Sequence, residues 1–352
     1  MSIGTAIAAF AATFALGTSA AAASDIPAPL PDSLRDTGLF EPGSVDVVLP
    51  GIRSFSPQYP LWSDGATKRR WVSMPAGGVI DASRAAAWAF PAGIRFWKEF
   101  SVGGRRVETR LIEHLADGSW RFASYVWNSA GTEAALAPAN GIRSLEIADG
   151  AHYRIPSQAD CRACHEGAAA PLLGFTALQL SPDRDPLAPH AEAPRSGDLD
   201  LPTLVKEGWL KGLPQELVEK PPRIHAPTPA GRAVLGYLHA NCGQCHADPS
   251  LAAGAVPVEA QFALDPADPA AGERVIRMLV ERESRYRPRG AADVHLVVPG
   301  DAATGTLMAR VRSRDPRIQM PPLGTAKPDL EAIALLERWI EQDLDNDREQ
   351  KP

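Results

Sequence analysis

Between residues 61 and 156, apolar and polar positions alternate in short runs rich in β-branched and aromatic residues. Glycine-containing turns at 103–104, 117–118 and 149–150 separate several of these runs, a pattern typical of antiparallel hairpins. The predicted strands are 70–75, 93–100, 107–115, 120–127 and 142–147. We therefore predict that residues 24–156 form an antiparallel, β-rich, sandwich-like domain that begins with a Pro-, Asp- and Gly-rich arm extending to about residue 54.

From residue 226 onward the apolar positions recur at helical spacing instead. Thr228 followed by Pro229 predicts a helix start, and a second helix is predicted over 272–283. A last helix begins near Asp329 and carries apolar residues on one face. The predicted fold class is thus α+β multidomain, with an all-α class I cytochrome c domain over 226–352. Residues 157–225 are predicted to be the first haem-binding segment and a loop-rich linker.

Two copies of the pattern Cys-x-x-Cys-His stand in and after this linker. They contain all four cysteines of the chain, and each is followed at once by one of its eight histidines. Two thiols three residues apart can each form a thioether to one haem vinyl group, and the next histidine can then ligate the iron. We predict two covalent haem c groups, bound by Cys161, Cys164 and His165 and by Cys242, Cys245 and His246.

Two other readings of the cysteine pairs are weaker. A four-cysteine zinc site places its pairs about 15–20 residues apart, whereas the gap here is several times longer and a histidine follows each pair. A thioredoxin-like redox pair requires a βαβ context that the flanking sequence lacks.

Met320 is predicted to be the second axial ligand of the haem at His246. It stands in the proline-braced segment 318–324, shortly before the last helix, where a class I cytochrome c presents its thioether. A neutral sulfur ligand favours the reduced iron and raises the potential. Met278 and Met308 lie at helical spacing among apolar residues and are predicted to be core residues.

The second axial ligand of the haem at His165 is left open by the sequence. The candidates are His114, His152, His190, His225 and Met74. His114 and His152 lie in or beside predicted strands, where a surface or hydrogen-bonded histidine is the commoner role.

The first residues form an apolar run that is too short to span a bilayer and is followed by small residues. This pattern predicts a secretory signal peptide over residues 1–23, and therefore a periplasmic protein. No Lys or Arg precedes the run, and an uncleaved membrane anchor is the alternative. Haem attachment on the export side of the bacterial membrane agrees with the periplasm. We expect no membrane span after cleavage.

Composition excludes some functions and leaves others open. A net charge of −6 and a pI near 5.8 argue against nucleic-acid binding. Six of the eight tryptophans lie in the β-rich region, where they form either a ligand surface or, as we favour, the core. The basic triplet 68–70 is either a docking patch for an acidic partner or, as we favour, a solvated strand end.

Residues 226–343 resemble a class I cytochrome c domain in the helix before the second motif, the Met320 loop and the terminal helix. The chain as a whole is similar to a family of uncharacterised bacterial proteins with such a domain at the C-terminus. The residues that carry this resemblance are 60–65, 90–93, 108–112, 125–128 with 132–133, 155–156 and 298–301. The resemblance implies haem and export, and it brings no established activity.

We expect a periplasmic dihaem cytochrome that carries single electrons between redox partner proteins. The alternative is a dihaem enzyme of the peroxidase or oxygenase type, with an open site at the first haem. In dihaem peroxidases, however, each haem sits in its own helical domain, whereas the first motif here follows a β-rich unit. A third reading is that the β-rich unit binds a partner protein and the haems connect it to electron flow.

Overall fold

The computed structural model describes residue 1 and residues 28–148, 151–168, 170–247, 260–287 and 294–344. The predicted signal peptide, 1–23, lies outside the described residues apart from Met1. Among the described residues, no helix has the length and apolar character needed to cross a membrane.

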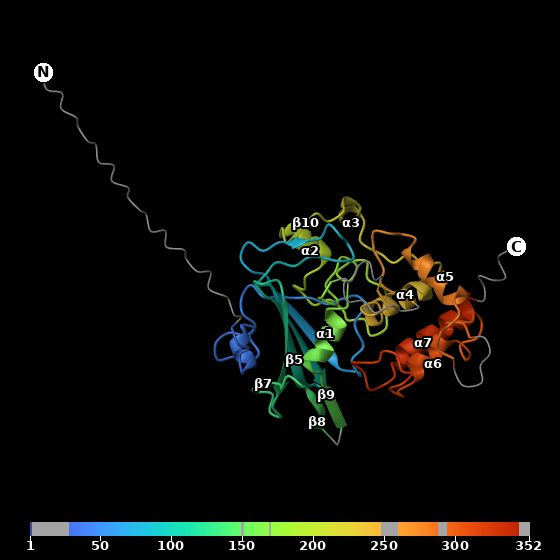
Figure 1. Ribbon diagram of the computed structural model, residues 1–352, viewed down its shortest axis with the longest axis horizontal. Helices are drawn as coiled ribbons and strands as arrows, with labels where there is room; N and C mark the ends of the chain where they lie inside the picture. Colours follow the sequence, from blue (N-terminus) through green and yellow to red (C-terminus); the bar gives the residue numbers. More distant parts are fainter. Residues whose placement is uncertain (2–27, 149–150, 169, 248–259, 288–293, 345–352) are drawn as a thin grey trace.

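A six-stranded antiparallel sheet occupies the N-terminal half of the chain (Figure 1). Successive side chains of each strand point to opposite faces of the sheet, and buried residues occur on both faces. Two smaller two-stranded sheets flank it. In spatial order the large sheet contains β1 (Arg53–Ser54), β2 (Thr67–Ser73), β4 (Arg95–Val102), β5 (Arg105–His114), β6 (Trp120–Trp127) and β7 (Ala134–Leu136). The small sheets pair β3 (Ile80–Asp81) with β10 (Leu210–Lys211) and β8 (Ile142–Ala148) with β9 (Ala151–Ile155).

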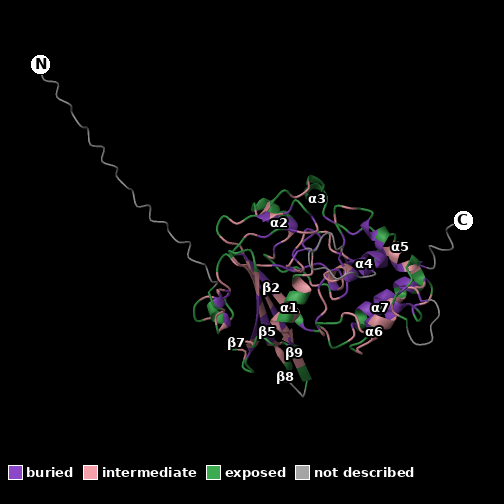
Figure 2. Cartoon of the chain, viewed as in Figure 1, coloured by how far each residue is buried: buried purple, intermediate pink, exposed green. Residues whose placement is uncertain are grey.

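One face of the large sheet packs against the N-terminal arm. Trp71, Trp97 and Leu111 lie opposite one another on β2, β4 and β5, so their side chains share this face. They form a buried cluster with residues of the arm, which contains the short 3-10 helix η1 (Leu34–Thr37). The tryptophan-rich strands therefore supply core, as Figure 2 illustrates by their buried colouring.

The other face of the sheet is covered by the chain that follows the first cysteine motif. Phe96 on β4 contacts Phe175 from that segment, with ring centroids 5.3 Å apart. The same buried cluster includes Leu204 of the short helix α2 (Leu201–Lys206). Loops and short helices, including α3 (Gln215–Glu219), therefore cover this face, where a sandwich would place a second sheet.

The chain from residue 229 onward contains four of the seven described α-helices and ends in a π-helical turn. Thr228 caps the first of them by accepting a hydrogen bond from the Gly231 amide, as the Thr-Pro pattern predicts. Asp329 caps the last in the same way. These elements are α4 (Pro229–Asn241), α5 (Ala271–Glu281), α6 (Thr306–Arg312), α7 (Leu330–Arg338) and η2 (Trp339–Asp343).

The predicted fold class, a sandwich-like domain followed by an all-α class I cytochrome c domain, is wrong. The molecule is a β-rich domain with a few short helices, and the longest described helix, α4, has 13 residues. The core of the C-terminal helices also includes Tyr59, Leu178 and Ala188, which lie outside the segment 226–352. The helices therefore do not close a core of their own, because the loops beside the sheet complete it.

Candidate cofactor sites

The first cysteine motif lies on helix α1 (Gln158–His165), directly after the β8–β9 hairpin. Ser157 caps this helix: its hydroxyl accepts from the Asp160 amide at 3.0 Å, and the Asp160 carboxylate accepts from the Ser157 amide at 3.0 Å. This capping box fixes where the helical turn begins. It therefore places Cys161 and Cys164, three residues apart, on neighbouring turns of one short helix.

His165 is held by a single backbone carbonyl. Its Nδ1 lies 2.6 Å from the Pro171 oxygen, and because a carbonyl only accepts, Nδ1 donates. The remaining nitrogen, Nε2, then carries the lone pair in the neutral ring. Burial, with Lys98 and Arg110 nearby, lowers the pKa of His165 to about 4, so the ring is neutral near pH 7. Such a carbonyl-anchored neutral imidazole is the arrangement found in metal-ligating histidines.

The second motif follows helix α4 without a break. The amide of Cys242 donates to the Leu238 carbonyl, and Cys245 donates to the Cys242 carbonyl at 3.1 Å. His246 Nδ1 lies 2.8 Å from the Ala260 carbonyl, and its ring packs on Phe262 at 5.1 Å between centroids. Both motif histidines therefore use Nδ1 on a main-chain oxygen. This shared geometry is compatible with Nε2 ligation in each.

The four cysteines are free thiols in this structure. Burial raises the pKa of Cys164 to about 11, to which Cys245 and Cys161 add, and burial raises that of Cys242 to about 12. The described residues contain no group of three or more His, Cys, Asp or Glu side chains placed to hold a metal ion.

A cleft of about 180 Å³ opens beside the first motif. Its walls are largely apolar, and its polar groups include Arg110, Tyr153 and Asp64. The residues present thus fit a haem attached at Cys161 and Cys164. Its apolar wall residues include Leu61, Leu111, Ile112, Phe122, Leu173 and Leu323.

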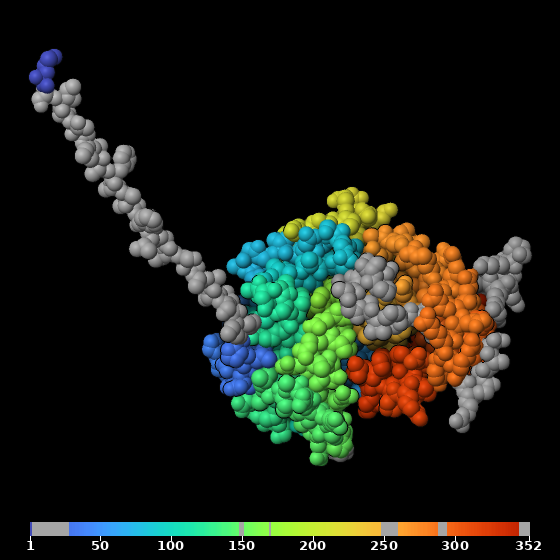
Figure 3. Space-filling view, in the orientation of Figure 1, coloured from blue at the N-terminus to red at the C-terminus, as the bar shows by residue number. Residues whose placement is uncertain are grey.

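The two motifs approach each other across this cleft. Asn241 and Gln244, from the second motif and the residue before it, line the cleft together with Cys161 and Cys164. The Cys245 thiol is also close enough to affect the pKa of Cys164. Figure 3 shows the first-motif region in light green between the strands and the C-terminal helices. Two groups attached at these cysteines would therefore be neighbours.

A loop from the N-terminal half ties the two motif regions together. The amide of Trp62 donates to the buried side chain of Asn241 at 2.7 Å. The Asp64 carboxylate accepts from the amides of Ala326 and Lys327, both at 2.9 Å. Residues 61–64 line the cleft. The loop therefore fixes the distance between the second motif and the segment that follows Met320.

Met320 lies six residues before Ala326. Its amide donates to the Arg310 carbonyl at 3.0 Å, and Arg310 Nε donates to the Ile318 carbonyl, so the predicted loop is anchored to α6. Met320 lines a small cavity with Asn241, the residue that precedes Cys242. The structure therefore brings Met320 to the neighbourhood of the second motif. Met308 is fully buried in the core, and Met278 packs partly buried against it.

The five candidates for the remaining ligand of the first haem all lie away from the cleft lining. His114 stacks on Trp120 with ring centroids 4.6 Å apart, and His152 is hydrogen-bonded to Ser144. His225 is exposed, and Met74 packs at the edge of the core on the covered sheet face. His190 stacks on Trp62 and bonds to Asp329 at 2.7 Å. The structure brings none of them to His165.

Sequence analysis did not predict a row of cations on the sheet face that is covered by the chain following the first cysteine motif. Arg70, Lys98 and Arg110 lie directly opposite one another on β2, β4 and β5. Lys68 and Arg70 are also buried, so the basic triplet is neither a docking patch nor a solvated strand end. Burial, with Arg70 and Lys68 nearby, holds the pKa of Lys98 well below its ordinary value. This row results from the register of the strands, which cannot be read from the sequence.

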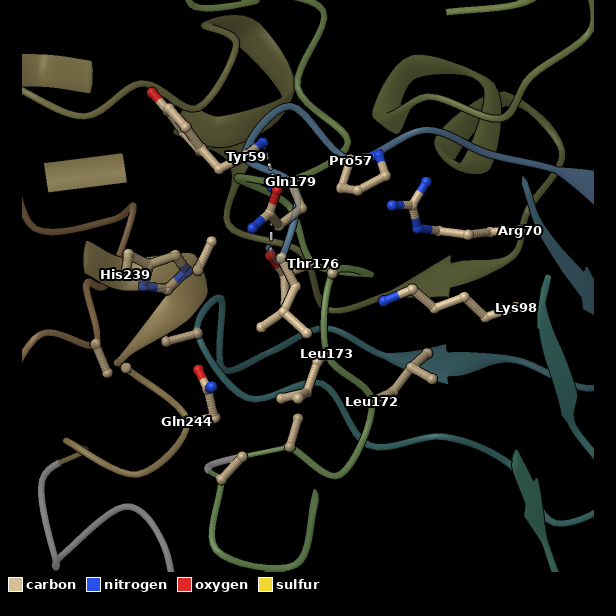
Figure 4. Close-up of a pocket in the computed structure, with 18 residues that line it drawn as sticks. Pro57, Tyr59, Arg70, Lys98, Leu172, Leu173, Thr176, Gln179, His239 and Gln244 are labelled. Atoms are coloured by element: carbon tan, nitrogen blue, oxygen red, sulfur yellow. Dashed lines mark hydrogen bonds between the residues drawn. The ribbon is translucent and has the colours of Figure 1, made fainter. Parts of the chain in front are cut away.

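A second cavity, of about 90 Å³, lies between this row and the C-terminal end of α4 (Figure 4). His239 borders it; burial lowers the pKa of this histidine to about 4, and its Nδ1 accepts from the Leu264 amide at 3.0 Å. Leu61, Leu173 and Gln244 line both cavities and so form the wall between them.

Neither a family model, nor a curated protein, nor a solved structure matches this chain.

Proposed function

We propose that this protein is a periplasmic dihaem c-type cytochrome that carries single electrons between redox partner proteins. The observation that carries the proposal is the meeting of two Cys-x-x-Cys-His motifs at one cleft, each with its histidine Nδ1 on a main-chain carbonyl. When bound, each haem supplies an iron that gains and loses one electron. Cys161, Cys164 and His165 hold one haem, and Cys242, Cys245 and His246 hold the other.

The chain's own residues determine the surroundings of these groups. His165 is fixed in ring orientation and tautomer by Pro171, which favours a stable bond from Nε2 to iron. Phe122 packs against the His165 ring at 5.3 Å, and Phe262 does the same for His246. These aromatic contacts shield part of each imidazole from water. Met320 would supply a thioether ligand to the haem held by His246, and the Arg310 contacts anchor the loop that carries it.

The closeness of the motifs supports electron transfer between the haems. Electron transfer becomes faster as the donor and acceptor approach, and the Leu61–Asp64 loop, with Asn241, holds the two motif regions together. A rigid spacing also keeps structural change on reduction small. The arrangement therefore suits a relay in which one haem receives the electron and the other passes it on.

A potentiometric titration of the purified protein, followed in the haem absorption bands, tests the proposal. Two one-electron steps per chain are expected. Replacing Cys161 and Cys164 with alanine should remove one step, and replacing Cys242 and Cys245 should remove the other. The variant His225→Ala, at an exposed histidine, is the control and should keep both. A single step in the unaltered protein contradicts the proposal.

One observation favours a second candidate, a dihaem enzyme of the peroxidase or oxygenase type. None of the five candidate ligands lines the cleft at His165, whereas Arg110 and Tyr153, which can move charge or protons, do. Binding of CO, cyanide or peroxide to the haem at His165 would favour this enzyme. Two low-spin haems that are inert to peroxide would exclude it.

A further inference from the structure

Lys98 stands at the centre of the cationic row, with an arginine on each side. Register pairs it with Arg70 on β2 and with Arg110 on β5, so the three side chains share one face of the sheet. Like charges directly opposite one another destabilise a sheet. When protonated, each of these side chains therefore requires a compensating negative group.

A carboxylate compensates the charge of each of the two arginines. Glu192 binds Arg70 through both oxygens, at 2.6 and 3.0 Å, and Glu108 binds Arg110 at 2.8 and 2.9 Å. Lys98 has no such carboxylate partner. Across the described ranges its ammonium makes no hydrogen bond and no ion pair, and it lies 5.1 Å from the centroid of the Phe100 ring. The guanidinium carbon of Arg110 also lies over the Phe100 ring, 4.3 Å from its centroid. The central cation of the row is thus the one left without a carboxylate.

Lys98 points into the cavity that separates the sheet from helix α4. Figure 4 shows its ammonium directed toward Thr176, with Arg70 beside it and His239 across the cavity. Gln179 and Gln244 add amide groups to the lining, and the remaining walls include Leu172 and Leu173. A volume of about 90 Å³ exceeds the 10–15 Å³ that one water needs, so a small anion fits.

We propose that this cavity binds a carboxylate group, with Lys98 as its charge partner and the neighbouring hydroxyl and amide groups as hydrogen-bond donors. Two kinds of molecule can supply this carboxylate group. One is a free small carboxylate such as formate or acetate. The other is a propionate of the haem at Cys161, because Leu61, Leu173 and Gln244 line both cavities. The second source rests on the proposed function, and the first does not.

Calorimetric titration of the holoprotein with sodium formate and sodium acetate tests the free source. Saturable binding of one carboxylate per chain is expected. Lys98→Met should weaken it by about tenfold or more, since hydrogen bonds to charged groups are among the stronger ones. Lys98→Arg, which keeps the charge, should retain binding within a few-fold. Because no haem signal is used, this result stands whatever the haem content proves to be.

Lys68→Met is the matched control. Lys68 is a buried lysine on the same face of the sheet, and it lines neither cavity. Its replacement should leave formate and acetate binding unchanged. If Lys68→Met weakens binding as strongly as Lys98→Met, the effect is one of general charge and the proposal is overturned.

Resonance Raman spectra without added carboxylate test the haem source. If a propionate occupies the cavity, its bending band shifts in Lys98→Met and does not shift in Lys68→Met, and free carboxylates do not bind. Far-ultraviolet circular dichroism checks that each variant is folded, and Lys98→Arg serves if Lys98→Met is not. Absence of both a saturable titration and a band shift overturns the proposal.

Discussion

The ring of Tyr59 lies directly against the backbone of Gly236 in helix α4. A Cβ atom at position 236 would come closer to the Tyr59 ring than side-chain atoms ever approach. Tyr59 itself is buried, and its hydroxyl donates to Asp185 at 3.0 Å. This contact joins the N-terminal half to the helix that leads into Cys242. Glycine is required at position 236 by the close approach of an aromatic ring.

Gly236→Ala is therefore expected to destabilise the protein. Overpacking a filled core costs about 1–3 kcal/mol of unfolding free energy. The control is Gly231→Ala in the same helix, where an added Cβ meets nothing nearer than 3.2 Å. That change should alter stability by less than about 1 kcal/mol, because alanine also favours the helix. Urea unfolding of both variants measures the difference, and equal stability of the two would contradict the packing argument.

Asn241→Ala should weaken the connection between the two motif regions. The side chain of Asn241 is buried, accepts from the Trp62 amide and donates to the Tyr237 carbonyl at 3.1 Å. Its loss leaves buried backbone groups without partners, at a cost of about 1–3 kcal/mol. Thermal unfolding followed by circular dichroism checks this. Asn128→Ala, at an exposed turn, is the control, and a matching loss there would refute the assignment.

Glu192→Gln should be costly because it leaves Arg70 buried without its carboxylate. The side chain of Arg70 is only 5% exposed. Removing one partner of a buried ion pair typically costs about 3–5 kcal/mol, and the partial exposure of Glu192 places this pair near the lower end. The exposed pair Glu273–Arg277 gives the control, since Glu273→Gln should cost less than about 1 kcal/mol. The prediction fails if chemical denaturation shows equal effects.

His190 should make stability depend on pH. Burial lowers its pKa, but the hydrogen bond to Asp329 and the charges of Asp329 and Glu331 outweigh this and raise the pKa above the ordinary 6.5. A raised pKa means that the folded state binds the proton more tightly. The stabilisation is therefore complete below pH 6.5 and is lost as pH rises through the folded-state pKa.

His190→Asn should remove this component. The difference in unfolding free energy between the unaltered protein and the variant is expected to shrink as pH rises above 6.5. Urea unfolding at a series of pH values measures it. His225→Asn, at an exposed histidine, is the comparison. A difference that grows with pH would reverse the sign and contradict the assignment.

Met320→Ala tests the axial ligand proposed at His246. In an optical spectrum of the oxidised protein, the weak long-wavelength band that marks a methionine-to-iron bond should disappear. Met278→Ala should retain it, since Met278 lies on helix α5 and its sulfur accepts from the Gln261 amide. Persistence of the band in Met320→Ala would mean that another residue ligates that iron.

Local features of the fold could be predicted from the sequence, whereas its assembly could not. Thr228 and Asp329 cap helices where their side chains suggest, and alternation locates β6 at residues 120–127. The predicted sandwich failed because alternation shows that one face of a strand is buried without showing what covers it. Here loops around Phe175 do so. The all-α domain failed because helical periodicity does not reveal that Tyr59 completes the core.

The same distinction between local features and assembly applies to the candidate sites. The motif residues could be found because their spacing along the chain determines their chemistry. The meeting of the motifs at one cleft, and the burial of Lys98 between two arginines, depend on register and on contacts between distant segments. No local pattern carries that information.

The central claim is that this chain binds two haems covalently through its four cysteines. Pyridine haemochrome absorbance of the purified protein, divided by the amount of chain from amino-acid analysis, measures it most directly. The account predicts two haems per chain, and one each when Cys161 and Cys164, or Cys242 and Cys245, are replaced with alanine. A count of none or one in the unaltered, exported protein would contradict it.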